Sequence, residues 1–527
     1  MNDIITGIMA TARREPDRAA IIDGRGRELA YGELARRVDA VRAALAAPGG
    51  GTGRGAGGGT GPGNGGGLRP GDGVLFAVRP GVDAVVTALG AVAAGGMLVL
   101  ADPGLAPGVL AARMAATRPA WVVAESLLHT LGGPLKSLAR RRGLLLPDLR
   151  DPLPGHPVRH LYTGPWLPGV PRGAVRLAGL IARSDGPGAA GPGRAGTGAD
   201  APDTSGIPAD QPAAVIFTSG TTASPRGVVH TRGSLAAGLE LFRSAFPLGP
   251  GDVVHTDQLM LGLPALMAGA AWSLPGGGPL VEELAARRAT HTFAVPVHLD
   301  RLLRRTPRLP ETLRHLLLGS APAPAGVLRR AVEAGPQVLS VYAMTEALPI
   351  AIASAEEKLA HTGGDLLGAP LPGVGVRVGG DGELFVSGPH VAPHYLGEGP
   401  LHEVATGDLV RIEGGRLVLL GRKKDMLLRD GFNIYPGLYE PAITALPGVA
   451  EAAIVGLADP GTGDEEVVLA VVPTAGYDEA LLGKALPDVV DAAALPDRIV
   501  ALDAFPRAGR ADKLDRAALR NLVARRG

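Results

Sequence analysis

Residues 218–227, "TSGTTASPRG", form a loop of small and hydroxyl-bearing side chains directly after the apolar run "AAVIF". The ten residues include two glycines, five serines or threonines, and the cation Arg226. Backbone N–H groups and hydroxyls in such a loop can approach an anion closely, because no large side chain intervenes. The composition predicts a phosphate-binding loop, and a flexible surface linker is the alternative.

A Walker-type nucleotide loop does not fit this stretch. That motif ends on a lysine followed by serine or threonine, and it continues as a helix. Here that lysine is missing, and the β-branched pair Val228 and Val229 predicts a strand. We therefore expect a phosphate loop of another kind, placed before a strand.

Length and composition exclude several classes of protein. A chain of 527 residues is too long for one core, so at least two domains are expected. The net charge of +1 and the lack of clustered basic and aromatic residues argue against a nucleic-acid partner. The chain has no cysteine, which excludes disulfides, thiolate catalysis and Cys-ligated metals.

No run of the sequence approaches the ~18 apolar residues that a membrane-spanning helix needs. Residues 1–20 contain Asp3 and no sustained apolar core, so they lack the pattern of a signal peptide. We expect a soluble, cytoplasmic protein without a membrane span.

Alternating strand and helix patterns predict an α/β fold. The segments "GVLFAVRP" and "GMLVLADP" have the pattern of buried strands on either side of a helix, "GVDAVVTALGAVAAG". Leu34, Val38, Val41 and Leu45 form one apolar stripe at helical spacing. Near the C-terminus two strand patterns precede helical stretches, the last over 513–526, and predict a small α+β domain.

The expected division is a large multi-layer α/β N-terminal domain over 1–420 and a small α+β C-terminal domain over 425–527. An abrupt charged junction at 421–424 separates the two. Glycine- and proline-rich stretches near 47–67 and 184–206 bury too little apolar surface to offset the entropy of ordering them. We expect these two stretches to be flexible insertions.

Four further segments follow the loop in order: "VYAMTEALP" (341–349), "ATGDLVRI" (405–412), "GRKKD" (421–425) and "PRAGRADKLDRAAL" (506–519). Together with the loop they resemble the adenylate-forming, or AMP-binding, superfamily, which includes acyl-CoA synthetases, luciferases and the adenylation domains of peptide synthetases. The resemblance covers nearly the whole chain. It implies that the C-terminal domain is mobile and rotates about a hinge at 421–424, with Lys424 at the hinge position.

The resemblance also implies a two-step reaction. A carboxylate attacks the α-phosphorus of ATP, pyrophosphate leaves, and an acyl adenylate forms; the acyl group then passes to coenzyme A. ATP, Mg²⁺ and coenzyme A are the implied cofactors, and a small-molecule carboxylic acid is the implied substrate. Both reactants of the first step are anions, so positioning and preorganised positive charge supply most of the rate.

Nucleotide binding is implied for three parts of the sequence. Tyr342 matches the aromatic residue that stacks on adenine. Asp408, an acceptor when ionised, suits the paired ribose hydroxyls, and Arg422 assists it. The loop is implied to grip the β- and γ-phosphates through Thr218, Ser219, Gly220, Thr221, Thr222 and Arg226.

Catalytic roles are implied for three residues. Glu346 matches the Mg²⁺ ligand, because a hard cation that bridges phosphates prefers carboxylate oxygen. Thr345 is implied to contact the α-phosphate, and Lys513 to bridge the substrate carboxylate and the α-phosphate as a mobile point charge. The alternatives are a capping Thr345 beside a solvated Glu346, a solvated surface Lys513, and an Asp408 that only forms an Asx turn.

The acid and the acceptor are less clearly indicated. The segments at 256–272 and 290–303, which line the acyl pocket in the family, offer Leu, Met, Ala and Gly, and lack the Phe-Asp pair of amino-acid-activating relatives. An apolar, fatty-type acid is therefore favoured. The histidines of this region are more typical of packed or capping residues: His255, His291 and His298. "GFNIYP" (431–436) resembles the segment that forms the coenzyme A tunnel, with Gly431 in it and Leu438 where glutamate is usual.

Three alternatives stay open. The acceptor could be the phosphopantetheine of an acyl carrier protein, or "TEALP" could indicate a β-lactone synthetase, which closes a ring with a β-hydroxyl. A different class is an inactive nucleotide-binding scaffold. That class is suggested by four departures from the family pattern: Ala223, Ala343 and Asp512 in place of glycine, and Arg226 in place of lysine, which is smaller and not forked.

Overall fold

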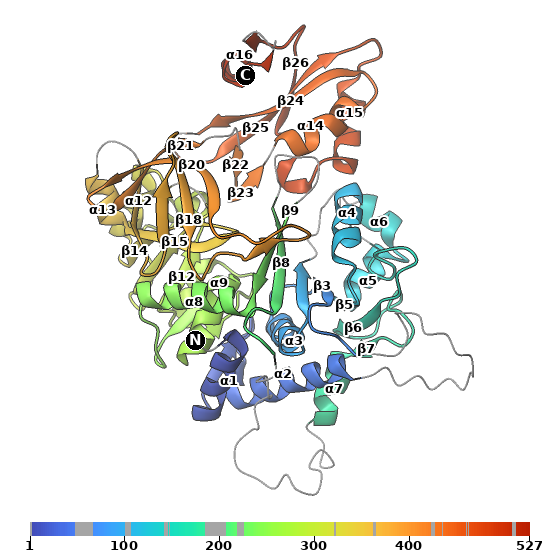
Figure 1. Cartoon of the computed structure of the whole chain (residues 1–527), viewed down its shortest axis with the longest axis vertical. Helices are drawn as coiled ribbons and strands as arrows, with labels where there is room; N and C mark the ends of the chain where they lie inside the picture. The colour runs from blue at the N-terminus through green and yellow to red at the C-terminus, as the bar shows by residue number, and fades with distance from the viewer. Residues whose placement is uncertain are drawn as a thin grey trace, which may run out of the picture.

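The computed structural model describes residues 3–47, 67–100, 107–141, 146, 148–184, 207–218, 226–320, 323–361, 365–422, 427–434, 436–459, 461, 463–508 and 513–526. It shows a mixed α/β protein with a large N-terminal part and a small C-terminal part, which confirms the predicted fold class (Figure 1). The predicted insertions near 47–67 and 184–206 lie almost entirely outside the described residues.

Two sheets form the framework of the large domain. In spatial order the first contains β17 (Gly375–Val378), β18 (Glu383–Ser387), β20 (Val404–Glu413), β21 (Arg416–Arg422), β16 (Asp365–Pro370), β15 (Ala347–Ser354), β14 (Gln337–Met344), β13 (His315–Leu318), β12 (His291–Ala294), β10 (Val253–His255), β11 (Ala271–Ser273), β1 (Ala19–Ile22) and β2 (Glu28–Ala30). The second contains β19 (His394–Tyr395), β9 (Arg226–Thr231), β8 (Pro212–Thr218), β4 (Met97–Leu100), β3 (Gly73–Ala77), β5 (Trp121–Glu125), β6 (Arg159–Thr163) and β7 (Val175–Arg176).

Helices connect and cover these strands (Figure 1). They are α1 (Ile4–Arg14), α2 (Tyr31–Ala46), α3 (Val82–Ala93), α4 (Pro107–Thr117), α5 (Ser126–Gly132), α6 (Lys136–Arg141), α7 (Leu177–Ser184), α8 (Arg232–Ala245), α9 (Leu259–Ala268), α10 (Leu280–Ala286), α11 (Pro296–Leu303), α12 (Ala325–Glu333) and α13 (Ala355–Ala360). The predicted stripe of α2 is confirmed, because Leu34, Val38, Val41 and Leu45 are fully buried. None of the described helices is long and apolar enough to cross a membrane.

Parallel strands position the edge at which the site forms. β10, β12, β13 and β14 are parallel neighbours, so their carboxyl ends lie along one edge of the first sheet. Parallel sheets are covered on both faces, which explains why β13 reads as the apolar run "HLLL". Ligands of open α/β sheets bind outside these carboxyl ends, where the chain leaves the strands as loops.

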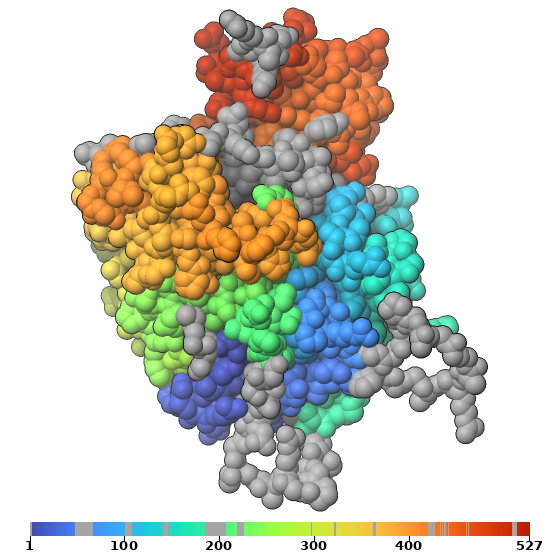
Figure 2. Space-filling model, in the orientation of Figure 1, coloured from blue at the N-terminus to red at the C-terminus, as the bar shows by residue number. Residues whose placement is uncertain are grey.

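The small domain forms a separate lobe at the top of the molecule (Figure 2). A hairpin of β22 (Leu427–Arg429) and β23 (Phe432–Ile434) leads into it. Its sheet contains β24 (Val449–Ala458), β25 (Glu465–Pro473) and β26 (Arg498–Ala501), and its helices are α14 (Pro436–Thr444), α15 (Glu479–Ala485) and α16 (Arg516–Ala524). Apolar clusters pack on both faces of this sheet, because neighbouring residues such as Ile454 and Val455 point to opposite sides.

The helix predicted over 513–526 begins later than expected. Lys513 and Leu514 form β28, which pairs with β27 (Arg507–Ala508). The helix α16 starts at Arg516, because the Asp515 side chain accepts the backbone N–H of Ala518 and caps its first turn.

Several histidines are buried as neutral rings. Burial lowers the pKa of His129 and of His390 to about 4, and that of His291 to about 3. His291 also stacks on His315, with 4.6 Å between the ring centroids. Neither ring nitrogen of His129 or His390 has a hydrogen-bond partner within the described part of the chain. Protonating any of these rings inside the protein is therefore unfavourable.

We expect the free energy of unfolding to fall as the pH drops from about 6.5 to 4. The unfolded chain binds a proton on each such histidine near pH 6.5, whereas the folded chain does not until the lowered pKa is reached. Each ring should cost roughly 2 kcal/mol between pH 7 and pH 5. Chemical denaturation of His129→Leu at both pH values should show a smaller pH-dependent loss, and His402→Gln, at an exposed histidine, should not change it.

Candidate active site

Glu346 lies in the tight turn that follows β14. Thr345 and Glu346 connect β14 to β15, in which Met344 pairs with Ala347. The Glu346 side chain is buried, and the Tyr395 hydroxyl donates a 3.0 Å hydrogen bond to its Oε1 atom. Burial raises the pKa of Glu346, while the Tyr395 hydroxyl and the nearby Arg226 favour its ionised form. The structure thus places one constrained carboxylate at the carboxyl edge of the parallel strands.

His230 fixes this turn from the second sheet. Its Nε2 lies 2.7 Å from the Thr345 carbonyl oxygen, and its Nδ1 lies 3.2 Å from the Ser234 hydroxyl. Burial lowers the pKa of His230, so the neutral ring can donate to the carbonyl from Nε2 and accept from the hydroxyl at Nδ1. No local sequence pattern indicates this contact, because the two partners are 115 residues apart.

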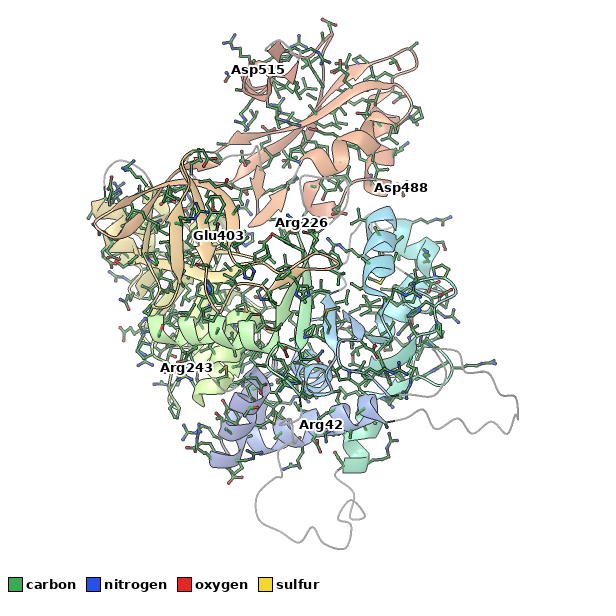
Figure 3. All side chains as sticks on the ribbon, in the orientation of Figure 1. Arg42, Arg226, Arg243, Glu403, Asp488 and Asp515 are labelled. Carbon is green, nitrogen blue, oxygen red and sulfur yellow. The ribbon has the colours of Figure 1, made fainter. Side chains whose placement is uncertain are left out.

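Arg226 is the first residue of β9, and its guanidinium pairs with a second carboxylate, that of Glu398. Its Nη2 and Nε atoms lie 2.7 and 3.2 Å from the two carboxylate oxygens of Glu398. Its guanidinium carbon lies 3.6 Å from the centroid of the Tyr395 ring. Tyr395 is on β19, which pairs with β9, and its hydroxyl reaches Glu346. Arg226, Tyr395, Glu346 and Glu398 therefore form one contact cluster, and Figure 3 shows Arg226 beneath the small domain.

The predicted nucleotide residues Tyr342 and Asp408 lie together. The Tyr342 hydroxyl, from β14, donates a 2.8 Å hydrogen bond to Oδ2 of Asp408, on β20. Asp408 is opposite Arg422 in the register of β20 and β21. Tyr342 is four positions before Glu346 on the same strand and turn. The structure therefore brings Tyr342, Asp408, the Arg422 backbone and Glu346 to one region of the sheet.

The loop itself is mostly outside the described residues. Thr218 ends β8 and pairs with Arg226 at the start of β9, so residues 219–225 connect two antiparallel strands. The predicted strand at Val228 and Val229 is confirmed. The predicted site residues that lie outside the described residues are Ser219, Gly220, Thr221, Thr222 and Lys424, and only the backbone is described for Arg422 and Lys513.

Gly431 lies against the large domain. It stands in the turn between β22 and β23 with a positive φ of +80°. A Cβ atom at Gly431 would lie 3.2 Å from Ser320 and 3.3 Å from Val295. Val295 directly follows β12 and Ser320 lies two positions after β13, at the edge that also carries Glu346. The hairpin tip of the small domain therefore meets the carboxyl ends of the parallel strands.

In this arrangement, the backbone of Lys513 is on the side of the small domain opposite the Gly431 hairpin. Its strand β28 pairs only with β27 among the described strands. Asp515, two residues later, lies at the far end of the small domain, well away from Arg226 (Figure 3). The structure does not bring Lys513 to the cluster of Arg226 and Glu346.

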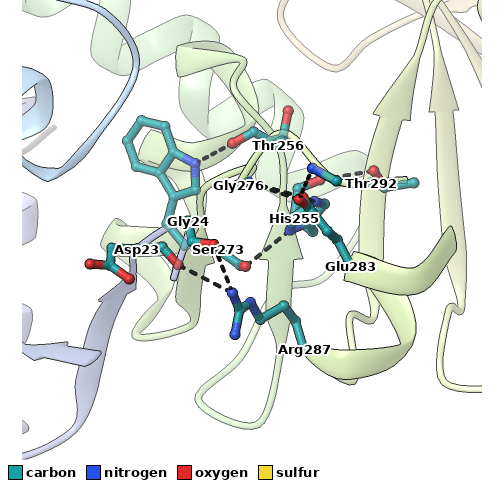
Figure 4. Close-up of polar contacts among 11 residues, drawn as sticks. Asp23, Gly24, His255, Thr256, Ser273, Gly276, Glu283, Arg287 and Thr292 are labelled. Carbon is teal, nitrogen blue, oxygen red and sulfur yellow. Dashed lines mark hydrogen bonds and ion pairs between the residues drawn. The ribbon is translucent and has the colours of Figure 1, made fainter. Parts of the chain in front are cut away.

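His255 belongs to a buried polar network (Figure 4). Its Nδ1 lies 3.0 Å from the Ser273 hydroxyl, and its Nε2 lies 3.2 Å from a carboxylate oxygen of Glu283. Glu283 also accepts the backbone N–H groups of Gly276 and Gly278 at 3.0 and 2.7 Å. The network fixes the loop after β11 onto α10, so His255 is a structural residue. His298, by contrast, lies 3.4 Å from Asp430 on the small-domain hairpin.

A Mg²⁺ ion fits this site if phosphate oxygens supply most of its ligands. No group of three or more His, Asp or Glu side chains that could hold a metal occurs in the ranges the structure describes. Glu346 supplies one constrained carboxylate near the cation Arg226. Mg²⁺ in nucleotide sites is typically held by one or two carboxylates, substrate phosphates and water. The donor set is compatible with that pattern.

Comparison with known proteins agrees with the motifs. Residues 65–396 match the family of AMP-binding enzymes, and residues 439–511 match the AMP-binding enzyme C-terminal domain. Indoleacetate–CoA ligase from Aromatoleum aromaticum is 31% identical over 349 residues, which cover 60% of this chain and 68% of that protein.

Solved structures share the fold over the whole chain. An amide bond synthetase from Marinactinospora thermotolerans superposes with a TM-score of 0.76 at 24% identity, covering 99% of both chains. A double mutant of o-succinylbenzoate CoA synthetase from Bacillus subtilis, bound to the product analogue OSB-NCoA, gives 0.75 at 21% identity and 98% coverage of both chains. The same Bacillus enzyme with its acyl-adenylate intermediate OSB-AMP gives 0.61, at 21% identity and 98% coverage of both chains.

The family match spans more than half of the chain and includes the segments around Arg226, Tyr342 and Glu346. The small C-terminal domain matches its counterpart separately. The chain therefore belongs to the family of AMP-binding enzymes and is similar to acyl-CoA synthetases, in a superfamily whose CoA-ligase members use ATP, Mg²⁺ and coenzyme A.

Proposed function

We propose that the protein activates an apolar carboxylic acid with ATP as an acyl adenylate and then transfers the acyl group to coenzyme A. The observation that carries this proposal is a set of contacts that connects the two sheets of the large domain. Arg226 stacks on Tyr395, Tyr395 donates to Glu346, and Glu346 follows the strand of Tyr342, which donates to Asp408. The structure thus brings three groups into one region: the cation Arg226, the metal-compatible carboxylate Glu346 and the ribose-compatible carboxylate Asp408.

In the proposed first step these residues hold ATP for attack. The hydroxyl-rich loop from Thr218 to Arg226 holds the β- and γ-phosphates, and Thr345 contacts the α-phosphate. Asp408, with Arg422, binds the ribose hydroxyls, and Tyr342 contacts adenine. Glu346 would hold Mg²⁺, which neutralises phosphate charge when bound. The substrate carboxylate forms a bond to the α-phosphorus, the bond from that phosphorus to the bridging oxygen breaks, and pyrophosphate leaves.

In the proposed second step, the small domain turns the hairpin of β22 and β23 toward the large domain, and Lys513 faces away from it. We propose a large domain over 1–420, a hinge at 421–424 that includes Lys424, and a mobile domain over 425–527. The contact of Gly431 with the edge near Val295 and Ser320 supports a transfer arrangement. The higher similarity to the complex with a product analogue than to the acyl-adenylate complex also supports it. The thiol of coenzyme A attacks the acyl carbonyl carbon, and AMP leaves.

The substrate is proposed to be apolar, of either fatty or aryl type. The segments at 256–272 and 290–303 supply mainly aliphatic side chains, which favours an apolar acid over an amino acid. The related ligases compared above are named for indoleacetate and o-succinylbenzoate, both aromatic acids. The acids to be tested as substrates therefore include aryl acids as well as fatty acids.

ATP–pyrophosphate exchange with a panel of acids tests the proposal. The panel holds indoleacetate, o-succinylbenzoate, fatty acids of increasing length and several amino acids. We expect exchange with at least one aryl or fatty acid and none with the amino acids. If a folded preparation shows exchange with no acid and forms no thioester, the result would contradict the proposal and favour the inactive nucleotide-binding scaffold.

The product's mass then identifies the acceptor. We expect an acyl-CoA thioester when coenzyme A is supplied. Three other products would each identify a different acceptor for the second step. A thioester formed only with a phosphopantetheinylated carrier protein would identify that protein, an amide would identify an amine, and a lactone would identify a hydroxyl of the acyl group itself.

A further inference from the structure

The loop cation Arg226 is held by two partners that lie outside the segments on which the family resemblance was based. Two of its nitrogens lie opposite both oxygens of the Glu398 carboxylate, at 2.7 and 3.2 Å. The face of the guanidinium lies over the Tyr395 ring, with 3.6 Å from its carbon to the ring centroid. Glu398 follows Tyr395 by three residues in the turn after β19, and its N–H donates to the Tyr395 carbonyl. One short turn therefore supplies both partners.

These contacts account for arginine in place of the family's lysine. A guanidinium is planar and forked, so it can pair with both carboxylate oxygens and stack on an aromatic face at once. A lysine ammonium is a compact point charge without that fork. Arg226 can therefore contact Glu398 and Tyr395 at the same time.

We propose that Glu398 is a positioning residue that competes with pyrophosphate for Arg226, and so weakens the retention of pyrophosphate after the first step. This inference rests on the proposed function, in which Arg226 contacts the β- and γ-phosphates. The guanidinium pairs with Glu398 in an arrangement where the Gly431 hairpin meets the large domain. Under the proposed function this is the transfer arrangement, which follows the release of pyrophosphate in the reaction sequence.

The carboxylate acts on pyrophosphate in two ways. It pairs with Arg226, the cation that would otherwise bind pyrophosphate. It also places a negative charge beside the site of the pyrophosphate polyanion, which repels it. Both side chains of the pair are partly exposed, at 42% for Arg226 and 49% for Glu398, so the pair can open when a phosphate arrives. The Tyr395 ring holds the guanidinium nearby in either state, because a stacked cation needs no fixed hydrogen-bond direction.

The test is the affinity of the full chain for magnesium pyrophosphate, measured by isothermal titration calorimetry. Exposed ion pairs are weak, so Glu398→Gln should lower the dissociation constant by about two- to fivefold. The apparent KM for ATP in pyrophosphate exchange should fall by a similar factor. In an Arg226→Lys background the same substitution should have a smaller effect, because the forked and stacked pair is already absent.

A matched control exists elsewhere on the large domain. Glu403 pairs with Arg377, which stacks on Phe385 at 4.1 Å from its ring centroid, so this pair repeats the same chemistry. Glu403 directly precedes β20, and Figure 3 shows it beside the outer strands of the first sheet. Glu403→Gln should leave the pyrophosphate affinity unchanged, and thermal melting should show both variants folded.

Unchanged or weaker pyrophosphate binding by Glu398→Gln would overturn the competition. The calorimetric measurement needs no substrate acid and no turnover. If the unaltered chain exchanges with no acid, the proposed function fails while the binding measurement still reports on Glu398. If exchange occurs but the affinity does not respond to Glu398→Gln, only this inference fails.

Discussion

Replacing Lys513 by alanine should abolish acyl-adenylate formation and spare thioester formation from a supplied acyl adenylate. The first step brings a substrate carboxylate against the α-phosphate of ATP, and a lysine point charge between them offsets their repulsion. Removing one preorganised electrostatic contact of this kind costs about 10²–10³ in rate. Transfer to coenzyme A starts from an adenylate that already exists, so that step does not need the lysine.

The structure gives this prediction a geometric basis. The segment of Lys513 lies at the far end of the small domain, while Gly431 lies against the carboxyl ends of the parallel strands. In the arrangement described, the lysine is therefore remote from the site. In the proposed two-step reaction, a rotation of the small domain brings this lysine to the α-phosphate for the first step alone.

Both half-reactions are measured on one preparation, with pyrophosphate exchange for the first and release of AMP from a supplied adenylate for the second. Lys484→Ala is the control, because it removes an exposed lysine from the same domain. Equal losses in both half-reactions would contradict the assigned role. Full exchange activity in Lys513→Ala would identify Lys513 as a solvated surface residue.

Local sequence patterns predicted those parts of the fold that depend on local constraints. The apolar stripe of α2 and the strand after the loop follow from the spacing and branching of neighbouring side chains. The start of α16 was predicted three residues too early. A paired strand at Lys513 and Leu514 and the cap at Asp515 decide that boundary, and the pairing partner is in another segment.

The contact cluster could not be predicted, because distant segments form it. Tyr395 is 49 residues from Glu346, and Glu398 is 172 residues from Arg226. They meet because β19 pairs with β9, and a strand of two residues has no distinctive sequence pattern. The sequence also contains both the Lys513 and the Gly431 segments, so it could not indicate which of them faces the large domain.

Gly431→Trp should have the reverse effect of Lys513→Ala. Pyrophosphate exchange should survive, and thioester output should fall by orders of magnitude. A Cβ atom at this glycine would already lie 3.2 Å from Ser320 and 3.3 Å from Val295, and these two residues leave little space for an indole. The hairpin could not then dock at the sheet edge, so the arrangement proposed for transfer would be blocked.

The positive φ of Gly431 offers a second explanation, which a matched variant separates. A non-glycine residue at a φ of +80° strains the backbone wherever it occurs, and that strain could destabilise the small domain and impair both steps together. Gly476, in the same domain, has a φ of +87° and no atom within 4 Å of an added Cβ among the described residues.

Gly476→Trp therefore carries the backbone strain without the contact to the large domain. If strain is the cause, Gly431→Trp and Gly476→Trp should lose stability alike and lower both half-reactions in parallel. If docking is the cause, only Gly431→Trp should lose transfer, and it should keep exchange. Transfer that survives in Gly431→Trp would show that acyl transfer does not need this hairpin at the sheet edge, because an indole at that position cannot coexist with the contacts to Ser320 and Val295.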